Sequence, residues 1–289
     1  MQTSRTATAL RSTLVLAAFG LSLFASQHSA NATPADRTVC PAGCTDTSLQ
    51  AAVEAAPDGG VIEVRSDVYE AVEIHDKKLV IRYDWQHRVT IDGGNANATL
   101  YVGPNAELTT WGLDITGSVQ AGVWNEGTVK LRNTYLYGIE SLYGAVLNFG
   151  FAVIRDNSLV SNNHSTSYYA GGVNNVGGVI QTWAGCVTFM GNTGYNGGAL
   201  SNHDGTVRLR GCSFTGNDAY LGGAIHNSFG DITVENSSFS TNHAASLGGA
   251  WSNHNIGGTV TVTGSGYAGN TTGTGQYEDC YDVNGSCTP

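Results

Sequence analysis

The sequence predicts an all-β fold, a single-stranded right-handed parallel β-helix with an N-terminal capping helix. In the clearest copies of its repeat, a run of small residues ending in Asn is followed by an aromatic residue with a second Asn three positions later. One copy is Gly197–Asn202 (Gly-Gly-Ala-Leu-Ser-Asn) with Phe214–Asn217 (Phe-Thr-Gly-Asn). A fixed period of this kind indicates a solenoid, because each repeat can bury its apolar face only against its neighbours.

Two series of Asn residues mark the period. The first series recurs at the spacing expected of a solenoid coil and comprises Asn125, Asn148, Asn175, Asn202, Asn227 and Asn253. The second follows its partners by a little over half a coil and comprises Asn162, Asn192, Asn217, Asn242 and Asn270. Asn and Gly adopt left-handed backbone conformations easily and therefore suit sharp corners. We expect each series to form a ladder in which stacked amides satisfy one another.

Short strands lie between these corners. Thr206–Arg210 (Thr-Val-Arg-Leu-Arg) and Thr259–Thr263 alternate apolar and polar residues, which is typical of a half-buried strand. Weaker strands of the same kind are expected at 61–64, 72–74, 79–82 and 89–92.

A short amphipathic helix is predicted before the first coil. Leu49, Ala52, Val53 and Ala56 form one helical stripe that stops at Pro57. Because the end of a solenoid exposes unpaired strand edges, we expect this helix to cover the N-terminal end.

The chain begins with the three parts of a secretory signal. Arg5 and Arg11 form the positive region, 13–24 the apolar core, and Ala30-Asn31-Ala32 the cleavage site. The apolar core is too short to span a bilayer, and no other transmembrane segment is expected. We predict a signal peptide at 1–32, an N-terminal cap at 33–58, a β-helix at 59–271 and a disulfide-closed tail at 272–289.

The composition agrees with an exported solenoid. A charged content of 12% and 39 glycines suit a thin-walled, corner-rich structure. Removal of Arg5 and Arg11 with the signal takes the formal net charge from −10 to −12, which argues against nucleic acid as a partner. The expected mature protein is secreted, extracellular or attached to a bacterial outer surface, and monomeric.

Six cysteines in an exported chain indicate disulfides. The pairs we expect are Cys280–Cys287 in the tail and Cys40–Cys44 beside the helix, with Cys186–Cys212 in successive coils as a third candidate. A metal site is the alternative, but the cysteines contain no CxxC pair, and no metal is predicted.

The repeat resembles a known pattern. Gly-Gly-Ala-Leu or Gly-Gly-Ala-Ile at 197–200 and 222–225, followed by Phe-x-x-Asn at 214–217 and 239–242, resembles the repeat of polymorphic outer membrane proteins of the chlamydial type. The segment 55–64 is similar to the start of many β-helix proteins of the pectate-lyase-like superfold. The first resemblance implies a surface-exposed passenger associated with adhesion, and the second implies the right-handed β-helix.

Enzymes with this fold that cleave acidic polysaccharides need clustered carboxylates. The best candidates are Asp92 and Asp114, whose separation is close to one coil and which are therefore expected on one face, with Arg132 above Arg155 nearby. The competing interpretation is that Asp92 is a turn residue before Gly93 and that the arginines are solvated.

The histidines are the candidates for binding. Stacking would place His203, Ser228 and His254 in one column and Ser201, His226 and Ser252 in the next. With Asp204 nearby, imidazole and carboxylate groups of this kind can hold a divalent cation. The alternative, which we favour, is that they are solvated corner residues.

The aromatic residues fall into two groups. Phe189, Phe214, Phe239 and Tyr267 recur once per coil, which indicates an internal stack. Less regular aromatics, which are better suited to ligand contacts, are Trp111, Trp124, Trp183, Trp251, Tyr168, Tyr169 and Tyr195.

These patterns favour a secreted, adhesin-like protein that binds an extracellular glycan or cell-surface ligand without catalysis. The alternative is a polysaccharide lyase or glycoside hydrolase that acts on acidic polysaccharide. No cofactor is expected, and calcium would enter only with the lyase alternative. Because one fold of this kind hosts many functions, the outward side chains must decide between the two.

Overall fold

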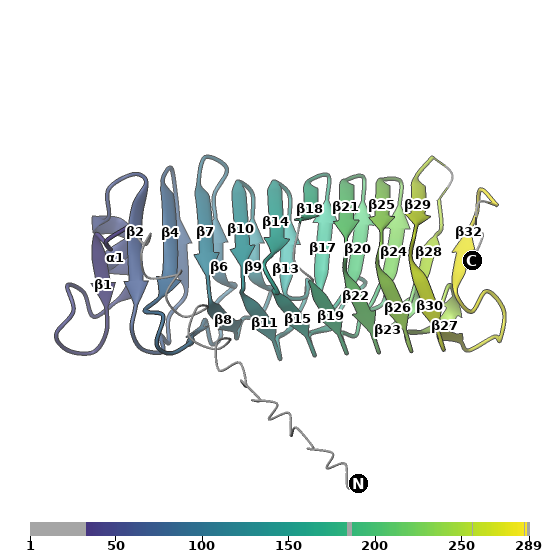
Figure 1. Cartoon of the computed structure of the whole chain (residues 1–289), viewed down its shortest axis with the longest axis horizontal. Coiled ribbons are helices and arrows are strands. Elements are labelled where there is room, and N and C mark those ends of the chain that lie inside the picture. Colours follow the sequence, from purple (N-terminus) through teal and green to yellow (C-terminus); the bar gives the residue numbers. More distant parts are fainter. Residues whose placement is uncertain (1–32, 184–186, 256, 286, 288–289) are drawn as a thin grey trace, which may run out of the picture. The chain divides into compact units, whose positions relative to one another are not determined.

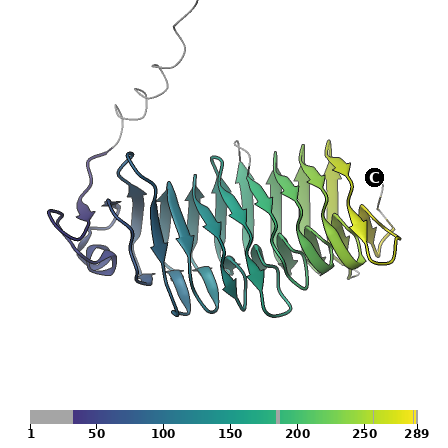
Figure 2. The ribbon, with the colours of Figure 1, turned by 90° about the horizontal axis from the view of Figure 1, so that it is seen from below.

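The strands stack in register along one axis and form a right-handed parallel β-helix, which confirms the predicted fold class (Figure 1). The computed structural model describes residues 33–183, 187–255, 257–285 and 287. The chain divides after Pro34, and the second unit, 35–289, contains the solenoid. The predicted signal peptide at 1–32 lies outside the described residues. The view in Figure 2 shows the coils following one another from the N-terminal helix to the C-terminal tail.

Three large sheets form the walls of the solenoid within the described residues. Sheet I contains β1 (Arg37–Val39), β2 (Gly60–Val64), β4 (Lys78–Tyr83), β7 (Glu107–Trp111), β10 (Thr128–Arg132), β14 (Phe151–Arg155), β18 (Val179–Trp183), β21 (Thr206–Arg210), β25 (Asp231–Glu235) and β29 (Thr259–Thr263). Sheet II contains β5 (Val89–Asp92), β8 (Leu113–Thr116), β11 (Tyr135–Tyr137), β15 (Leu159–Ser161), β19 (Thr188–Met190), β22 (Ser213–Thr215), β26 (Ser238–Ser240) and β30 (Gly266–Ala268).

Sheet III contains β3 (Val72–Ile74), β6 (Ala98–Val102), β9 (Ala121–Asn125), β13 (Val146–Asn148), β17 (Val173–Val176), β20 (Leu200–His203), β24 (Ile225–Ser228), β28 (Trp251–Asn253) and β32 (Cys280–Asp282). Shorter strands complete the coils at β12 (Glu140–Ser141), β16 (His164–Ser165), β23 (Asp218–Leu221), β27 (His243–Leu247) and β31 (Thr271–Thr272). Strands β1 and β32 extend sheets I and III on either side of the segment 59–271.

The first Asn series forms a buried ladder in sheet III. From Asn125 to Asn253, the Nδ2 group of each residue donates to Oδ1 of the next at 2.6–3.0 Å. At the C-terminal end, Nδ2 of Asn253 donates to Oδ1 of Asp282 at 3.0 Å. The amides therefore all point the same way, and the chain of hydrogen bonds finishes on a carboxylate, which is a strong acceptor.

The second ladder begins at Asn163, so the expectation of Asn162 as its first member is wrong. Asn162 is exposed and turns the corner with φ 52°, whereas the adjacent Asn163 is buried. From Asn163 through Asn270, Nδ2 donates to the next Oδ1 at 2.9–3.0 Å. This ladder also finishes on a carboxylate, because Nδ2 of Asn270 donates to Oδ1 of Asp279 at 3.0 Å.

The recurring aromatic residues form a stack inside the solenoid. Phe189, Phe214, Phe239 and Tyr267 lie with their ring centroids 5.0, 4.8 and 5.3 Å apart and their planes within 10° of parallel. Trp251, expected to be a contact residue, is instead 2% exposed and donates from Nε1 to the hydroxyl of Tyr267 at 3.0 Å.

The N-terminal helix α1 (Leu49–Ala55) buries Leu49, Ala52 and Val53 against the first coils. It begins after Ser48, whose side chain accepts a hydrogen bond from the backbone of Ala51, the usual way to satisfy a helix start. In the described residues, α1 is not long enough to cross a membrane.

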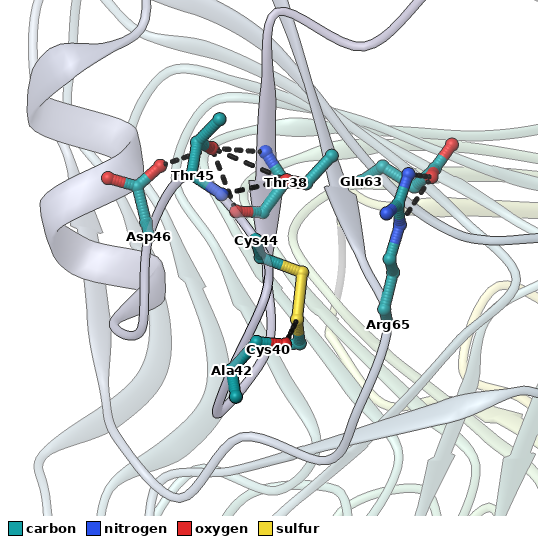
Figure 3. The surroundings of a disulfide bond; sticks show 8 residues. All are labelled: Thr38, Cys40, Ala42, Cys44, Thr45, Asp46, Glu63 and Arg65. Atoms are coloured by element: carbon teal, nitrogen blue, oxygen red, sulfur yellow. Dashed lines mark hydrogen bonds and ion pairs between the residues drawn. A yellow bond between two sulfur atoms is a disulfide. The ribbon is translucent and has the colours of Figure 1, made fainter.

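Two disulfides close the ends of the described chain. Cys40 and Cys44 are joined in the loop before α1, where Thr38 and Thr45 exchange hydrogen bonds beside them (Figure 3). Cys280 is joined to Cys287 in the tail. Of the third candidate pair, Cys186 lies outside the described residues, and Cys212 is buried with its Sγ 3.3 Å from Oγ1 of Thr182.

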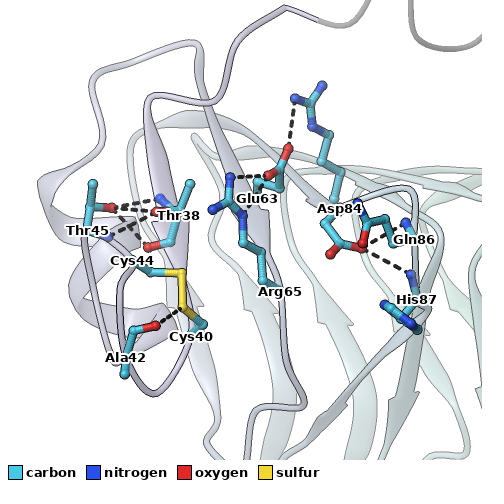
Figure 4. Close-up of polar contacts among 11 residues, drawn as sticks. Thr38, Cys40, Ala42, Cys44, Thr45, Glu63, Arg65, Asp84, Gln86 and His87 are labelled. Atoms are coloured by element: carbon cyan, nitrogen blue, oxygen red, sulfur yellow. Dashed lines mark hydrogen bonds and ion pairs between the residues drawn. A yellow bond between two sulfur atoms is a disulfide. The ribbon is translucent and has the colours of Figure 1, made fainter.

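Polar contacts brace the first turns of the coil. Glu63 binds Arg65 at 2.8 Å (Figure 4). Glu63 also binds Arg82 on the neighbouring strand at 3.3 Å. In the next loop, Oδ1 of Asp84 accepts hydrogen bonds from the backbone of Gln86 and His87.

Candidate functional site

The outward face of sheet I concentrates positive charge in an acidic protein. Side chains alternate along a strand, so the first, third and fifth positions of β21 face outward while Val207 and Leu209 are buried. Seven of the 13 Lys and Arg residues of the sequence occupy outward positions of sheet I, namely Lys78, Arg82, Lys130, Arg132, Arg155, Arg208 and Arg210. We call these positions the basic face.

Most cations in the N-terminal half of the basic face are paired with carboxylates of the protein itself. Lys130 is paired with Glu107 on the adjacent strand. Nε of Arg132 lies 2.6 Å from Oδ2 of Asp156, and its guanidinium lies 3.9 Å from the ring centre of Trp111. These cations are therefore already occupied within the protein.

The C-terminal half is different, because β18, β21 and β25 leave an open groove. This groove, which we call the Trp183 groove, has a volume of about 590 Å³ and is lined by the outward side chains of Gln181, Trp183, Arg208, Arg210, Thr233 and Glu235, among others. The side chain of Trp183 is 57% exposed, and its Nε1 donates to Oε1 of Gln181 at 2.8 Å, which fixes the orientation of the indole.

The cations of the Trp183 groove are largely available. Among the described residues, the guanidinium of Arg208 forms neither a hydrogen bond nor an ion pair. Arg210 has a loose pairing, with its Nε 3.9 Å from Oε2 of Glu235 and both side chains well exposed. Of the three strands that form the groove, β18 and β21 contain no Asp or Glu, and β25 contributes Glu235 to the lining. A planar indole beside two guanidinium groups suits a ligand with a flat apolar surface and carboxylates, which Arg binds in a bidentate manner.

The structure does not form the predicted carboxylate pair. Asp114 lies opposite Thr90, and Asp92 lies opposite Thr116, so the register of β5 and β8 carries Asp92 two positions past Asp114. Oδ1 of Asp92 accepts from the backbone of Gly94 at 2.8 Å, which is a turn contact. The two aspartates are therefore not an acid–base pair in register.

The other predicted members of that site are also engaged in internal contacts. Oδ1 of Asp114 accepts from Nε of Arg88 at 2.7 Å, and the guanidinium of Arg88 covers the ring of Tyr135. Arg132 does lie opposite Arg155, as predicted. Both contact Asp156, Arg155 at a longer distance of 3.5 Å.

The histidine columns have the predicted register, but His226 is not a solvated residue. Ser201 lies opposite His226, and His203 lies opposite Ser228. His226 is 2% exposed, and its Nδ1 and Nε2 lie 2.8 and 3.0 Å from the hydroxyls of Ser252 and Ser228. Burial, and then the charges of His254 and His203, lower the pKa of His226 to about 3. His226 is thus a neutral core residue and is not accessible to a ligand.

The remaining histidine candidates stay at the surface. Nε2 of His203 lies 3.5 Å from Oδ2 of Asp204, and both side chains are more than half exposed. His254 lies with its ring centroid 6.2 Å from that of His226. Among the described residues, no group of three or more His, Cys, Asp or Glu side chains could hold a metal ion.

Sequence reasoning singled out Trp183 but missed its partners. The alternation in Thr206–Arg210 predicts a strand with both arginines outward, so the sequence alone was enough to place these two side chains on the surface. What was missing was the register, which places Arg208 opposite Gln181 and Thr233.

Comparison with known proteins gives only distant structural matches. No protein-family model matches the sequence, and no curated protein matches it. A pectin methylesterase from carrot superimposes with a TM-score of 0.47 at 11% identity, covering 88% of this chain and 89% of that protein. An alginate lyase from a Paenibacillus species superimposes with a TM-score of 0.44 at 15% identity, covering 86% of this chain and 98% of that protein.

Proposed function

We propose that this protein is an exported glycan-binding protein that holds an acidic polysaccharide in the Trp183 groove. The observation that carries the proposal is the exposed indole of Trp183 beside Arg208 and Arg210 on an otherwise acidic chain. A sugar ring packs its apolar face on the indole, and the guanidinium groups bind the carboxylates of uronic acid units. Export is supported by the two disulfides together with the signal-like sequence of 1–32.

The matched pair of polygalacturonate and fully methyl-esterified pectin tests the charge requirement. The two polymers share a backbone, but only the first carries carboxylates. We expect binding of polygalacturonate that weakens as salt rises, because exposed charges are screened. The Arg208→Ser change should raise its Kd about tenfold, the loss of one charged hydrogen-bonded contact.

Two control variants locate the site. Lys78→Ser removes a cation from the far end of the same sheet, and Tyr69→Ala removes an aromatic side chain that is 79% exposed. Both should bind polygalacturonate as the wild type does. Equal binding of the two polymers, or equal loss in Lys78→Ser and Arg208→Ser, would contradict the proposal.

A lyase acting on the same polymer is the second candidate, favoured by Glu235 next to Arg210 in the groove. In such a reaction, Arg210 would neutralise the sugar carboxylate and Glu235 would remove the proton from the carbon next to it. The glycosidic C–O bond at the following carbon would break to form the C=C bond, and the departing oxygen would take a proton from water. Incubation with polygalacturonate and calcium should then release unsaturated ends, and Glu235→Gln should stop the release without weakening binding. Unchanged polymer with retained binding favours the binding protein.

A further inference from the structure

A second groove lies on sheet III at the N-terminal end, and its charge is opposite to that of the basic face. Its volume is about 440 Å³, and its lining includes Glu73, His75, Asn97, Tyr101, Gln120 and Trp124. Glu73 lies opposite Tyr101, and Tyr101 lies opposite Trp124, so three neighbouring strands form its floor. We call it the Tyr101 groove.

One carboxylate orders the two aromatic side chains. The hydroxyl of Tyr101 donates to Oε2 of Glu126 at 2.7 Å, and Nε1 of Trp124 donates to Oε1 of the same residue at 3.1 Å. Each carboxylate oxygen of Glu126 thus accepts a hydrogen bond from one aromatic side chain, which fixes the phenol and the indole before a ligand binds.

A second carboxylate lies at the edge of the groove. Oε2 of Glu73 is 3.2 Å from Nε2 of His75, and both side chains are more than half exposed. The imidazole lies in space left free by Gly103, because a Cβ there would be 3.2 Å from Nδ1 of His75. The His75 and Tyr101 ring centroids are 5.3 Å apart.

The groove is electronegative. None of the described residues that line it is Lys or Arg. The nearest lysine in the sequence, Lys77, points its Nζ to the backbone carbonyls of Val53, Glu54 and Ala56 at the end of α1. The hydrogen bond to Glu126, then burial, then the charges of Glu126 and Glu73 raise the pKa of the Tyr101 hydroxyl. A cation is therefore favoured here and an anion is disfavoured.

We infer that the Tyr101 groove binds a protonated amino sugar unit of a glycan. The ammonium group lies between the carboxylate of Glu73 and the faces of Tyr101 and Trp124, combining an ion pair with cation–π attraction. Asn97 and Gln120, joined by a 3.1 Å hydrogen bond, provide amide groups for the sugar hydroxyls. This site is independent of the Trp183 groove, because it lies on another sheet and selects the opposite charge.

Glucosamine oligomers and N-acetylglucosamine oligomers of equal length are the probes, measured by titration calorimetry with the full mature chain. We expect the free amine form to bind and the acetylated form, which lacks the charge, to bind at least tenfold more weakly. Glu73→Gln should weaken binding of the amine form about tenfold and leave the acetylated form unchanged. Trp124→Phe keeps a ring but removes the Nε1 donor, and it should weaken binding less than Trp124→Leu.

Thermal unfolding of each variant shows that it is folded. Trp183→Ala is the matched control, since it removes an indole from the other groove and should bind the amine form as the wild type does. Equal affinity for the two oligomers, or no change in Glu73→Gln, would overturn the inference. So would loss of amine binding in Trp183→Ala. Failure of polygalacturonate binding leaves this prediction in force, because the two ligands use different residues.

Discussion

The first coils and the last coils fill the same interior positions with different side chains. In sheet III, the position of Asn125 in the later coils is Val102 in the coil before it. In sheet II, a column that begins with Ile91 and Ile115 continues further along as Phe189 and Phe214. All of these side chains are buried, so aliphatic residues, amides and aromatic rings all fill this cross-section.

The difference matters where the aliphatic column of sheet III ends and the Asn ladder begins. An aliphatic column can stop anywhere, but an amide needs a hydrogen-bond partner on each side. Oδ1 of Asn125 has no partner among the described residues, because Val102 stands before it. At the other end, Asp282 receives the last amide of the ladder. The sequence repeat therefore reflects how the interior is packed, and the residues that we propose for binding lie outside the repeat, on the outward faces of the strands.

The largest expected effect is at the middle of the ladder. Asn202→Val removes the acceptor of Asn175 and the donor to Asn227, and we expect the free energy of unfolding to fall by about 3 kcal/mol. Asn125→Val should cost only about 1 kcal/mol, since its Oδ1 is already unpaired and the preceding residue in the column is a valine. Denaturant unfolding measures both. Equal losses of unfolding free energy in the two variants would show that the first residue of the ladder contributes as much as a residue in its middle.

A pH dependence is expected from the buried His226. Its folded pKa of about 3 lies below the ordinary histidine value of 6.5, so the unfolded chain takes up a proton first as the pH falls. Its contribution to stability is complete above pH 6.5 and declines toward pH 3, by about 2 kcal/mol at pH 5. His226→Asn should lack that decline between pH 7 and 5, whereas the exposed His87→Asn should keep it. A wild-type pH profile in His226→Asn would contradict the neutral core histidine.

The smallest expected effect concerns the aromatic stack. Phe214 and Phe239 are stacked with centroids 4.8 Å apart. A double-mutant cycle with Phe214→Leu and Phe239→Leu should give a coupling energy of about 1 kcal/mol. The matched cycle in the aliphatic coils, with Ile91→Val and Ile115→Val, should be closer to additive. The same coupling in both cycles would mean that the rings add nothing beyond their size.

Much of the fold follows from the sequence because the interior repeats. The Asn periods, the alternating strands and the apolar stripe before Pro57 each have one simple physical explanation, and together they predict the β-helix. The sequence did not show which of Asn162 and Asn163 turns the corner and which joins the ladder. The two side chains are chemically identical, and only the backbone conformation distinguishes them.

The surface was harder to predict from the sequence. A spacing close to one coil suggested that Asp92 and Asp114 meet, but the local coil is two positions longer than that spacing, and the side chains miss each other. His226 was expected to be a solvated corner residue because serines interrupt the histidine columns, yet the hydroxyls of those serines are what allow a neutral imidazole to be buried. The Trp183 groove depends on three strands separated by about one coil each, so it appears only once the register is known.

The central claim is that the repeat builds the solenoid while non-repeated outward side chains bind the ligand. The most direct test measures polygalacturonate binding and the free energy of unfolding together, in Trp183→Ala and in Asn202→Val. We predict that Trp183→Ala unfolds like the wild type but binds at least about tenfold more weakly. Asn202→Val, measured where it is fully folded, should be less stable and bind with the wild-type Kd. Wild-type binding by Trp183→Ala, together with weakened binding by folded Asn202→Val, would contradict the claim.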